Sequence, residues 1–542
     1  MKKHSIARAA VTAGLTIAMS LGGALGPATM AFAEANDGQV TIETRADNDN
    51  TTLQGYQIFK ADVADTDSGK VASNLEWASE QVKEDVQTAT KQTFATAQDA
   101  ADYLATLTSS GSGYILANGD VLNAIAKTLR NDNVLIPTAV TPGTASTGMS
   151  TGYWLFVTSK ESTNNTDTTS KVDQTGTSPI FAIVGGKALN ITQKADIPTV
   201  DKFVKNNKSG SDWGKVADSE VGQELNYKLV GTVADNVSTY GTYYYKFTDT
   251  LSAGLTADAS SVVVKIQNGT NESKITTGFT TKLDVNTDGT STLSVEFTDL
   301  KDAAKTAGIT LDSNSKVNVY YNAKLDASKA SYKVASDDNP NEVKLTYSNN
   351  PNTDSKGDTT WHSVTDYTYK LAITKEDSTD ATKKLQGAKF TIQATDPDDS
   401  ASKDKYVQSD GTLGDTQFVF TTNENGEISV KGLDAGTYTV SETTAPIGYN
   451  KVADFTFTIT PTWTDDATKL KEVTVTNNDS ASVDSSFNTT SKQVELTVKD
   501  KAGHGLPLTG QAGVTITWVA GGVVLAFGVS RVIRNRREND AE

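Results

Sequence analysis

The chain has 542 residues, more than one hydrophobic core accommodates, so its length favours about three or four domains. It contains no cysteine, which excludes disulfides, thiolate metal sites and cysteine nucleophiles, and it has only three histidines, which argues against a histidine-based catalytic site. The net charge of −17, with acidic and basic residues interspersed, argues against nucleic-acid binding.

Residues 1–33 have the pattern of a secretory signal peptide. Lys2, Lys3 and Arg8 precede a short apolar run, and the A-F-A sequence at 31–33 offers small residues at the cleavage positions. A permanent membrane anchor is the alternative, but the run is short for a span and the cleavage pattern argues against it. We therefore expect a secreted mature chain that begins near Glu34.

Residues 34–196 are predicted to form a mixed α/β domain. Alternating apolar residues predict strands over GYQIFKAD (55–62) and GYWLFVTS (152–159), and helical spacing predicts helices over 77–107 and 119–130.

Two extended segments, 194–204 and 349–377, mark the next domain boundaries and define domains over 197–365 and 366–505. Both domains are rich in Thr, Val, Tyr, Asp, Asn and Gly, and their short alternating runs are separated by turn signals. This pattern is typical of Ig-like β-sandwiches. The predicted fold class is mainly β: a mixed α/β domain followed by two β-sandwiches.

The sequence DVNTDG (284–289) matches the first half of a calcium-binding EF-hand loop. The glutamate required at the twelfth position is replaced by Val295, with Glu296 one place late. Because the flanking sequences alternate as hairpin strands do, we predict a β-turn here and no metal site.

Strand parity places polar residues in line with buried apolar rows, because alternate residues of a strand face the core. The inward row of a strand includes one such residue in three places of the middle domain, at Lys202, Asp249 and Asn349, and in three places of the last domain, at Lys375, Glu442 and Asp500. Polar residues that merely end their strands, or plain buried salt bridges, are the alternatives. In the first domain, Lys60 has the parity of Tyr56 and Ile58, but no partner stands out.

The carboxyl end carries the pentapeptide LPLTG, formed by Leu506, Pro507, Leu508, Thr509 and Gly510. No charged residue lies between 505 and 530, and the most apolar part, 514–529, is just long enough to cross a membrane with help from its flanks. Four arginines follow within 531–537, as the positive-inside rule requires. The tail is therefore predicted to stop in the membrane with LPLTG just outside.

Together these motifs make the chain resemble the sortase-assembled backbone pilins of Gram-positive bacteria. The LPLTG tail resembles their sorting signal, YTVSETTAPIGY (438–449) resembles their E-box, and YSNNP (347–351) resembles the end of their middle domain. The resemblance implies two intramolecular isopeptide bonds, Lys202–Asn349 assisted by Asp249 and Lys375–Asp500 assisted by Glu442.

The third-domain acceptor departs from the commonest pattern, which has Asn where this chain has Asp500. Water would then leave instead of ammonia, and Asn477 and Asn478 are the fallback acceptors. The chemistry itself needs a neutral lysine amine and a protonated helper acid, and burial favours both neutral forms. It requires no cofactor, and each site reacts once.

Polymerisation needs an acceptor amine, and Lys194 is the candidate. Alternation places Leu189 and Ile191 inward and Lys194 outward, at the junction where the family has its acceptor lysine. The Tyr-Pro pair that usually precedes that lysine is Thr-Gln here, so Lys187 and Lys205 remain competitors.

The resemblance implies a structural protein and no turnover enzyme. A sortase would cleave after Thr509 and join it to Lys194 of a neighbouring copy, and a housekeeping sortase would attach the last subunit to peptidoglycan. The expected partners are further copies of the chain, minor pilins and the host surface, in a wall-anchored pilus outside the cell. A monomeric wall-anchored adhesin and a minor pilin at the tip or base are the alternatives.

Overall fold

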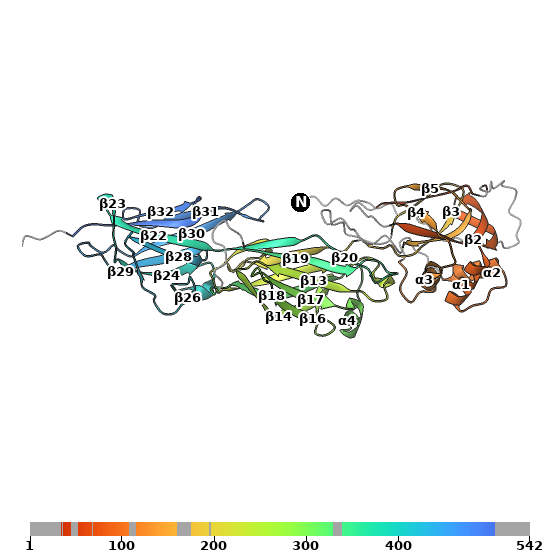
Figure 1. Ribbon diagram of the computed structural model, residues 1–542, viewed down its shortest axis with the longest axis horizontal. Helices are drawn as coiled ribbons and strands as arrows, with labels where there is room; N and C mark the ends of the chain where they lie inside the picture. The colour runs from red at the N-terminus through yellow and green to blue at the C-terminus, as the bar shows by residue number, and fades with distance from the viewer. Residues whose placement is uncertain are drawn as a thin grey trace, which may run out of the picture.

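The computed structural model describes residues 34, 36–44, 52–67, 69–107, 115–159, 175–193, 197–328 and 339–503. Its strands fall into three groups that share no sheet, and Figure 1 shows these groups end to end along the long axis of the molecule. We call them the first region (34–193), the middle region (197–367) and the C-terminal region (369–503). The architecture is mainly β, as the sequence predicted.

The first region combines two sheets with three helices on one side. The larger sheet has the order β3-β2-β6-β7 with β4 also paired to β2, and the smaller has the order β5-β1-β8. The elements are β1 Gly38–Ile42, β2 Leu53–Thr66, β3 Gly69–Trp77, α1 Glu80–Thr90, α2 Ala97–Thr106, α3 Val121–Asn131, β4 Thr138–Val140, β5 Ala145–Met149, β6 Gly152–Thr158, β7 Ile180–Val184 and β8 Leu189–Ile191.

Strand β6 is buried along its whole length because both of its faces are covered. Tyr153 and Leu155 pack in the core that contains the helices, whereas Trp154 and Phe156 pack in a second core that contains residues of the smaller sheet. On the neighbouring strand, a bulge between Gln57 and Phe59 buries two successive residues, Ile58 and Phe59. The parity therefore changes, and Lys60 is exposed instead of inward-facing.

The segment 77–107, with its predicted helical spacing, contains two helices, α1 and α2. Helix α1 ends where Lys91 adopts the left-handed conformation, with φ of 55°. Helix α2 begins with a capping box between Thr96 and Asp99. These local signals set the boundary inside a stretch of strong helix formers.

The middle region is a sandwich of two sheets with a shared core. One sheet has the order β10-β9-β12-β18-β14-β15, and the other has the order β11-β21-β19-β13-β17-β16 with β20 also paired to β19. The elements are β9 Val200–Lys205, β10 Trp213–Gly214, β11 Val216–Asp218, β12 Glu224–Thr232, β13 Tyr245–Leu251, β14 Leu255–Asn268, β15 Asn271–Ile275, β16 Thr280–Val285, β17 Ser291–Phe297, α4 Leu300–Thr306, β18 Lys316–Leu325, β19 Asn339–Ser348, β20 Lys356–Asp358 and β21 His362–Tyr367, with a 3-10 turn at Val237–Thr239.

The loop that contains DVNTDG is a hairpin turn, as predicted. Strands β16 and β17 pair antiparallel up to Val285 and Ser291, and the Asn286 N–H donates to the Thr290 carbonyl at 2.8 Å. Among the residues that the structure describes, no group of three His, Cys, Asp or Glu side chains is placed to hold a metal ion.

The C-terminal region is a second sandwich, with sheets β23-β22-β33-β32, where β28 also pairs with β22, and β26-β25-β24-β29-β30-β31, where β27 also pairs with β24. The elements are β22 Tyr369–Asp377, β23 Asp380–Lys384, β24 Lys389–Pro397, β25 Tyr406–Val407, β26 Leu413–Gly414, β27 Phe420–Thr421, β28 Glu427–Leu433, β29 Gly436–Thr444, β30 Phe455–Trp463, β31 Leu470–Asn477, β32 Val483–Asn488 and β33 Gln493–Asp500, with a 3-10 turn at Ser400–Ser402.

Strands β22 and β33, near the two ends of this region, lie side by side and run parallel. No helix within the described residues is long and apolar enough to cross a membrane. The predicted signal peptide (1–33) and the predicted span (514–529) both lie outside the described part of the chain.

Candidate functional site

Two lysines are completely buried, one in each sandwich. Lys202 on β9 and Lys375 on β22 each have a relative exposure of 0%. Each lies at an inward position next to apolar residues of the same row, Val200 and Val204 on β9 and Leu371 and Ile373 on β22. A buried lysine is costly unless it is paired or neutral, so the groups around each amine define a candidate site.

In the middle region, Lys202 forms a buried ion pair with Asp249, as the parity argument anticipated for these two residues. The Lys202 amine also lies 3.1 Å from the hydroxyl of Tyr321 on β18. That hydroxyl donates to the Asp249 carboxylate at 2.8 Å and accepts from the Asn341 carboxamide at 2.7 Å. Lysine, acid, carboxamide and hydroxyl thus form one closed cluster.

Strand register explains why Asp249 and Asn341 meet. Strand β13 pairs antiparallel with β19, so that Asp249 is opposite Val343 and Leu251 is opposite Asn341. Asp249 and Asn341 are therefore diagonal neighbours on one buried face. Lys202 reaches this pair from the facing sheet, where β9 pairs with β12.

The structure does not bring Asn349 to Lys202, and this part of the sequence prediction is wrong. Asn349 follows the end of β19, and at a strand rise of about 3.3 Å per residue it lies roughly 25 Å from Asn341 along the chain. Its side-chain oxygen accepts from Ser355 at 2.8 Å, and its carbonyl accepts from the Gly176 N–H of the first region. The carboxamide that faces the lysine cluster is Asn341.

Parity alone could not choose between these two asparagines. Asn339, Asn341 and Asn349 have the same parity and are all completely buried. Only the pairing of β19 with β13 places Asn341 near the acid. The YSNNP sequence belongs instead to the contact with the first region, where Asn350 lies 3.5 Å from the Ser159 carbonyl.

Burial shifts the proton affinities of the middle site in the direction that amine attack requires. Desolvation lowers the pKa of Lys202 to about 8, although Asp249 opposes the shift. Desolvation raises the pKa of Asp249 against the effect of Lys202. Desolvation, followed by the nearby Asp249, also raises the pKa of Tyr321 well above its usual value, so this hydroxyl stays protonated.

In the C-terminal region the structure brings together the three predicted residues. Lys375 contacts Asp500 directly and lies 3.3 Å from the Glu442 carboxylate. Glu442 also accepts from the Val452 N–H at 2.7 Å, and the Phe390 ring centroid lies 5.3 Å from the lysine amine. Desolvation raises the pKa of both carboxyl groups, and Lys375 opposes the shift in each.

The fallback acceptors of this region lie elsewhere. Asn477 donates to Ser485 at 2.9 Å and to the Val483 carbonyl at 3.2 Å, and Asn478 accepts from the Thr456 N–H at 2.7 Å. Asp500, and neither of these asparagines, contacts the Lys375 amine.

Lys194 and the LPLTG motif, Leu506 to Gly510, lie outside the described residues. The alternation that leads toward Lys194 does hold as far as the structure describes it: Ile191 and Gln193 are buried, whereas Asn190 and Thr192 are exposed. The competing lysines, Lys187 and Lys205, are both exposed.

Sequence reasoning missed a cluster of buried carboxyl groups where the middle and C-terminal regions meet. Asp218 accepts from Asn206 at 2.6 Å and from the Tyr369 hydroxyl at 3.0 Å, and Asp434 accepts from Asn207 at 2.5 Å. Desolvation raises the pKa of Asp218 to about 6. The hydrogen bonds of Tyr369 to Asp218 and of Asn207 to Asp434 cross between the two regions and fix their contact. Parity within one strand gives no signal for them.

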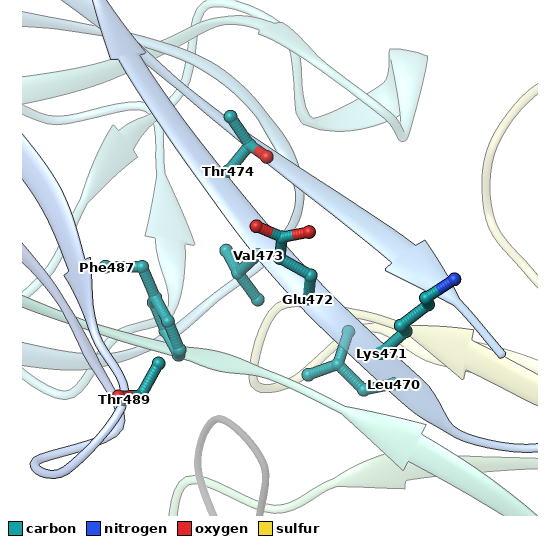
Figure 2. A pocket seen from close by; sticks show the side chains of 7 residues that line it. All are labelled: Leu470, Lys471, Glu472, Val473, Thr474, Phe487 and Thr489. Carbon is teal, nitrogen blue, oxygen red and sulfur yellow. The ribbon is translucent and has the colours of Figure 1, made fainter.

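A surface pocket of the C-terminal region lies between β31 and β32, the outer strands of the two sheets. Figure 2 shows that Leu470 to Thr474 line one side and that Phe487 and Thr489 line the other. None of these residues belongs to the two lysine clusters, so the pocket adds nothing to their chemistry.

Comparisons with known proteins identify one domain. Residues 369–479 match the family model SpaA, described as a prealbumin-like fold domain. No curated protein matches the chain.

Solved structures resemble the chain at low identity. The T6 backbone pilin of Streptococcus pyogenes is 15% identical, with a TM-score of 0.48, and the match covers 86% of this chain and 98% of that one. The major pilin SpaD of Corynebacterium diphtheriae is 16% identical with a TM-score of 0.44, covering 86% and 98%, and BcpA of Bacillus cereus is 14% identical with a TM-score of 0.38, covering 86% and 99%. At such scores, function has to be argued from the sites themselves.

Proposed function

We propose that the chain is the structural backbone subunit of a covalent cell-surface pilus. The observation that carries the proposal is the pair of fully buried lysines, each in contact with a carboxyl group, in successive sandwiches that lie end to end. A plain buried ion pair adds little net stability, whereas a covalent bond at the same place resists tension along a fibre. The proposed domains are 34–196, 197–365 and 366–505.

Each cluster has the groups for one intramolecular amide bond. In the middle domain, the Lys202 amine attacks the Asn341 carboxamide and ammonia leaves, with Asp249 as the acid. In the last domain, the Lys375 amine attacks the Asp500 carboxyl and water leaves, with Glu442 as the acid. The raised pKa of each acid and the lowered pKa of Lys202 support the neutral pair that this chemistry needs.

Between subunits, a sortase would cleave after Thr509 and join its carbonyl to Lys194 of the next copy. Repetition of this step gives a head-to-tail fibre whose last subunit is attached to peptidoglycan. The predicted signal peptide, the LPLTG sequence and the basic tail support this assembly route. In this route the chain is the substrate of the sortase and does not itself act as a turnover enzyme.

The test is to express the chain in its host bacterium, to extract the cell wall, and to boil the extract in detergent. We expect a ladder of high-mass species with the wild type and monomers only with Lys194→Ala. Lys187→Ala and Lys205→Ala are matched controls, because both are exposed lysines on the flanks of the same junction, and both should keep the ladder.

Each outcome distinguishes a different function. A ladder that persists in Lys194→Ala would refute the choice of lysine. A wild type without any ladder would favour a monomeric wall-anchored adhesin. Immunogold labelling confined to the fibre ends would favour a minor pilin over a backbone subunit.

A further inference from the structure

The hydroxyl of Tyr321 touches every reacting group of the middle site. It lies 3.1 Å from the Lys202 amine, it donates to Asp249 at 2.8 Å, and it accepts from the Asn341 nitrogen at 2.7 Å. A phenol has one proton to donate and two lone pairs, so these three contacts use its whole capacity. Tyr321 is completely enclosed by the core, at 1% exposure.

A proton from Asp249 needs a bridging group to reach the Asn341 nitrogen, which must leave as ammonia. The Asp249 carboxylate accepts hydrogen bonds from Lys202 and Tyr321, and the Asn341 nitrogen donates to Tyr321. The hydrogen-bonded path from the acid to the leaving nitrogen therefore passes through the tyrosine hydroxyl.

We propose that Tyr321 is a catalytic proton relay for the Lys202–Asn341 bond, and this inference rests on the proposed bond. In the resting cluster, protons point from Asn341 to Tyr321 and from Tyr321 to Asp249. When the proton shared by Lys202 and Asp249 resides on the acid, Asp249 donates to Tyr321. Once the amine has added to the Asn341 carbonyl carbon, Nδ2 is no longer an amide nitrogen and can accept, so Tyr321 then donates its proton to it.

The bond between the Lys202 Nζ and the Asn341 Cγ forms, and the bond between Cγ and Nδ2 breaks. Nδ2 takes the Tyr321 proton and leaves as ammonia, while Asp249 returns a proton to Tyr321. The surplus proton of the new amide nitrogen restores Asp249. Tyr321 and Asp249 end unchanged, and one proton has moved from the amine to the leaving group.

A neighbouring tyrosine provides a matched control. Tyr227 stacks on Tyr321 with ring centroids 5.3 Å apart, and the Lys202 amine lies 5.6 Å from both ring centroids. Both side chains are 1% exposed. Among the described residues, the Tyr227 hydroxyl has no hydrogen-bond partner. Removal of either hydroxyl perturbs the same core, but only removal of the Tyr321 hydroxyl interrupts the proton path.

The experiment follows bond formation in the full chain during cell-free translation. Samples taken at intervals are digested, and the linked peptide pair that contains Lys202 and Asn341 is quantified by its loss of one ammonia. Protease resistance gives the folded fraction at each time. We expect Tyr321→Phe to slow linking by about a hundredfold per folded chain. Tyr227→Phe should stay within about twofold of wild type, since its hydroxyl has no role in the step.

The outcomes separate this inference from the proposed bond. Absence of the linked pair in the wild type would overturn both. If the wild type links, two results would overturn the relay alone. One is a Tyr321→Phe chain that links as fast as wild type, and the other is a Tyr227→Phe chain whose linking is slowed as much as that of Tyr321→Phe.

If Tyr321→Phe does not fold, 3-fluorotyrosine placed at position 321 keeps the ring and the hydroxyl but makes the phenol more acidic. The relay predicts a linking rate that differs from wild type at position 321 and not at position 227. An unchanged rate at 321 would overturn it.

Discussion

Each of the two lysine clusters pairs a buried lysine with a carboxyl group of the facing sheet, but the third member comes from a different place. In the middle region, Lys202 comes from one sheet and both Asp249 and Asn341 come from the other. In the C-terminal region, Lys375 and Asp500 come from neighbouring parallel strands of one sheet, and Glu442 comes from the facing sheet. In both, one carboxyl group faces the lysine from the opposite sheet, Asp249 in the middle region and Glu442 in the C-terminal region. The proposed acceptor lies on the opposite sheet in the middle region and on the same sheet as the lysine in the C-terminal region.

The difference determines what each proposed bond would hold. The middle bond would tie one sheet to the other, and the C-terminal bond would tie the strand near the start of its region to the strand near the end. The acceptors also differ, because Asn341 would release ammonia and Asp500 would release water. A hydroxyl reaches the lysine and the acceptor in the middle region, whereas in the C-terminal region a backbone N–H, that of Val452, holds the acid.

The largest expected effect distinguishes the two asparagines of the middle region. Asn341→Ala should abolish the loss of ammonia and lower the free energy of unfolding of this region by about 4–5 kcal/mol, because the bond would close a loop of about 140 residues. For a region of this size the midpoint of thermal unfolding should fall by roughly 10–20 °C. Intact mass and calorimetry check both values.

Asn349→Ala is the control for this comparison. It removes the hydrogen bond from Ser355, so we expect a cost of about 1 kcal/mol and an unchanged loss of ammonia. The C-terminal region should lose water in both variants. Loss of the ammonia signal in Asn349→Ala, with its retention in Asn341→Ala, would contradict the assignment of Asn341.

An exchange of the acceptor types should change rates and not products. Asn341→Asp and Asp500→Asn each form, after reaction, the same amide as the wild type, so the linked chains should have identical masses. We expect Asp500→Asn to link faster than wild type, because a carboxamide has no charged form that must first be protonated. Asn341→Asp should link more slowly, by about tenfold or more, because its carboxyl must be neutral to react. Time-resolved peptide mapping checks both rates, and an Asp500→Asn chain that stays unlinked would contradict a role for Asp500.

Sequence patterns predicted more of the C-terminal site than of the middle site. Parity placed Lys375, Glu442 and Asp500 inward, and the structure groups all three. In the middle region it placed Lys202 and Asp249 inward, but the choice between asparagines of equal parity depends on register between strands far apart in sequence. The sequence gives no sign of a role for Tyr321, because an inward tyrosine on a strand is typical of a core.

Other differences also have local physical causes. The bulge in β2 turns Lys60 outward, and the capping box at Thr96 sets the start of a second helix within 77–107. The buried carboxyl groups at the contact of two regions come from loops and strand ends, where alternation gives no information.

The smallest expected effect is on the pH dependence of the stability of the middle region. This dependence should differ between a chain in which Lys202 is a free amine and one in which it is part of an amide. In Asn341→Ala, Lys202 stays an amine whose pKa burial lowers from 10.5 to about 8. A lowered pKa in the folded state stabilises the fold above the unfolded pKa, and this contribution is lost as the pH falls through about 8. The middle region of this variant should therefore gain stability between pH 7 and pH 10.5, by at most about 3 kcal/mol.

In the wild type the same nitrogen would be part of an amide and would not titrate in this range. Asp249 is present in both proteins, and the raised pKa of its carboxyl destabilises the fold as the pH rises, so the comparison between the two chains largely removes its effect. The difference between wild type and Asn341→Ala in the unfolding midpoint of the middle region should thus narrow as the pH rises. The C-terminal region is identical in both chains, so its midpoint should not differ between them at any pH. A gap that stays constant from pH 7 to pH 10 would mean that Lys202 has the same charge in both chains, and that the wild-type middle region holds an ion pair and no bond.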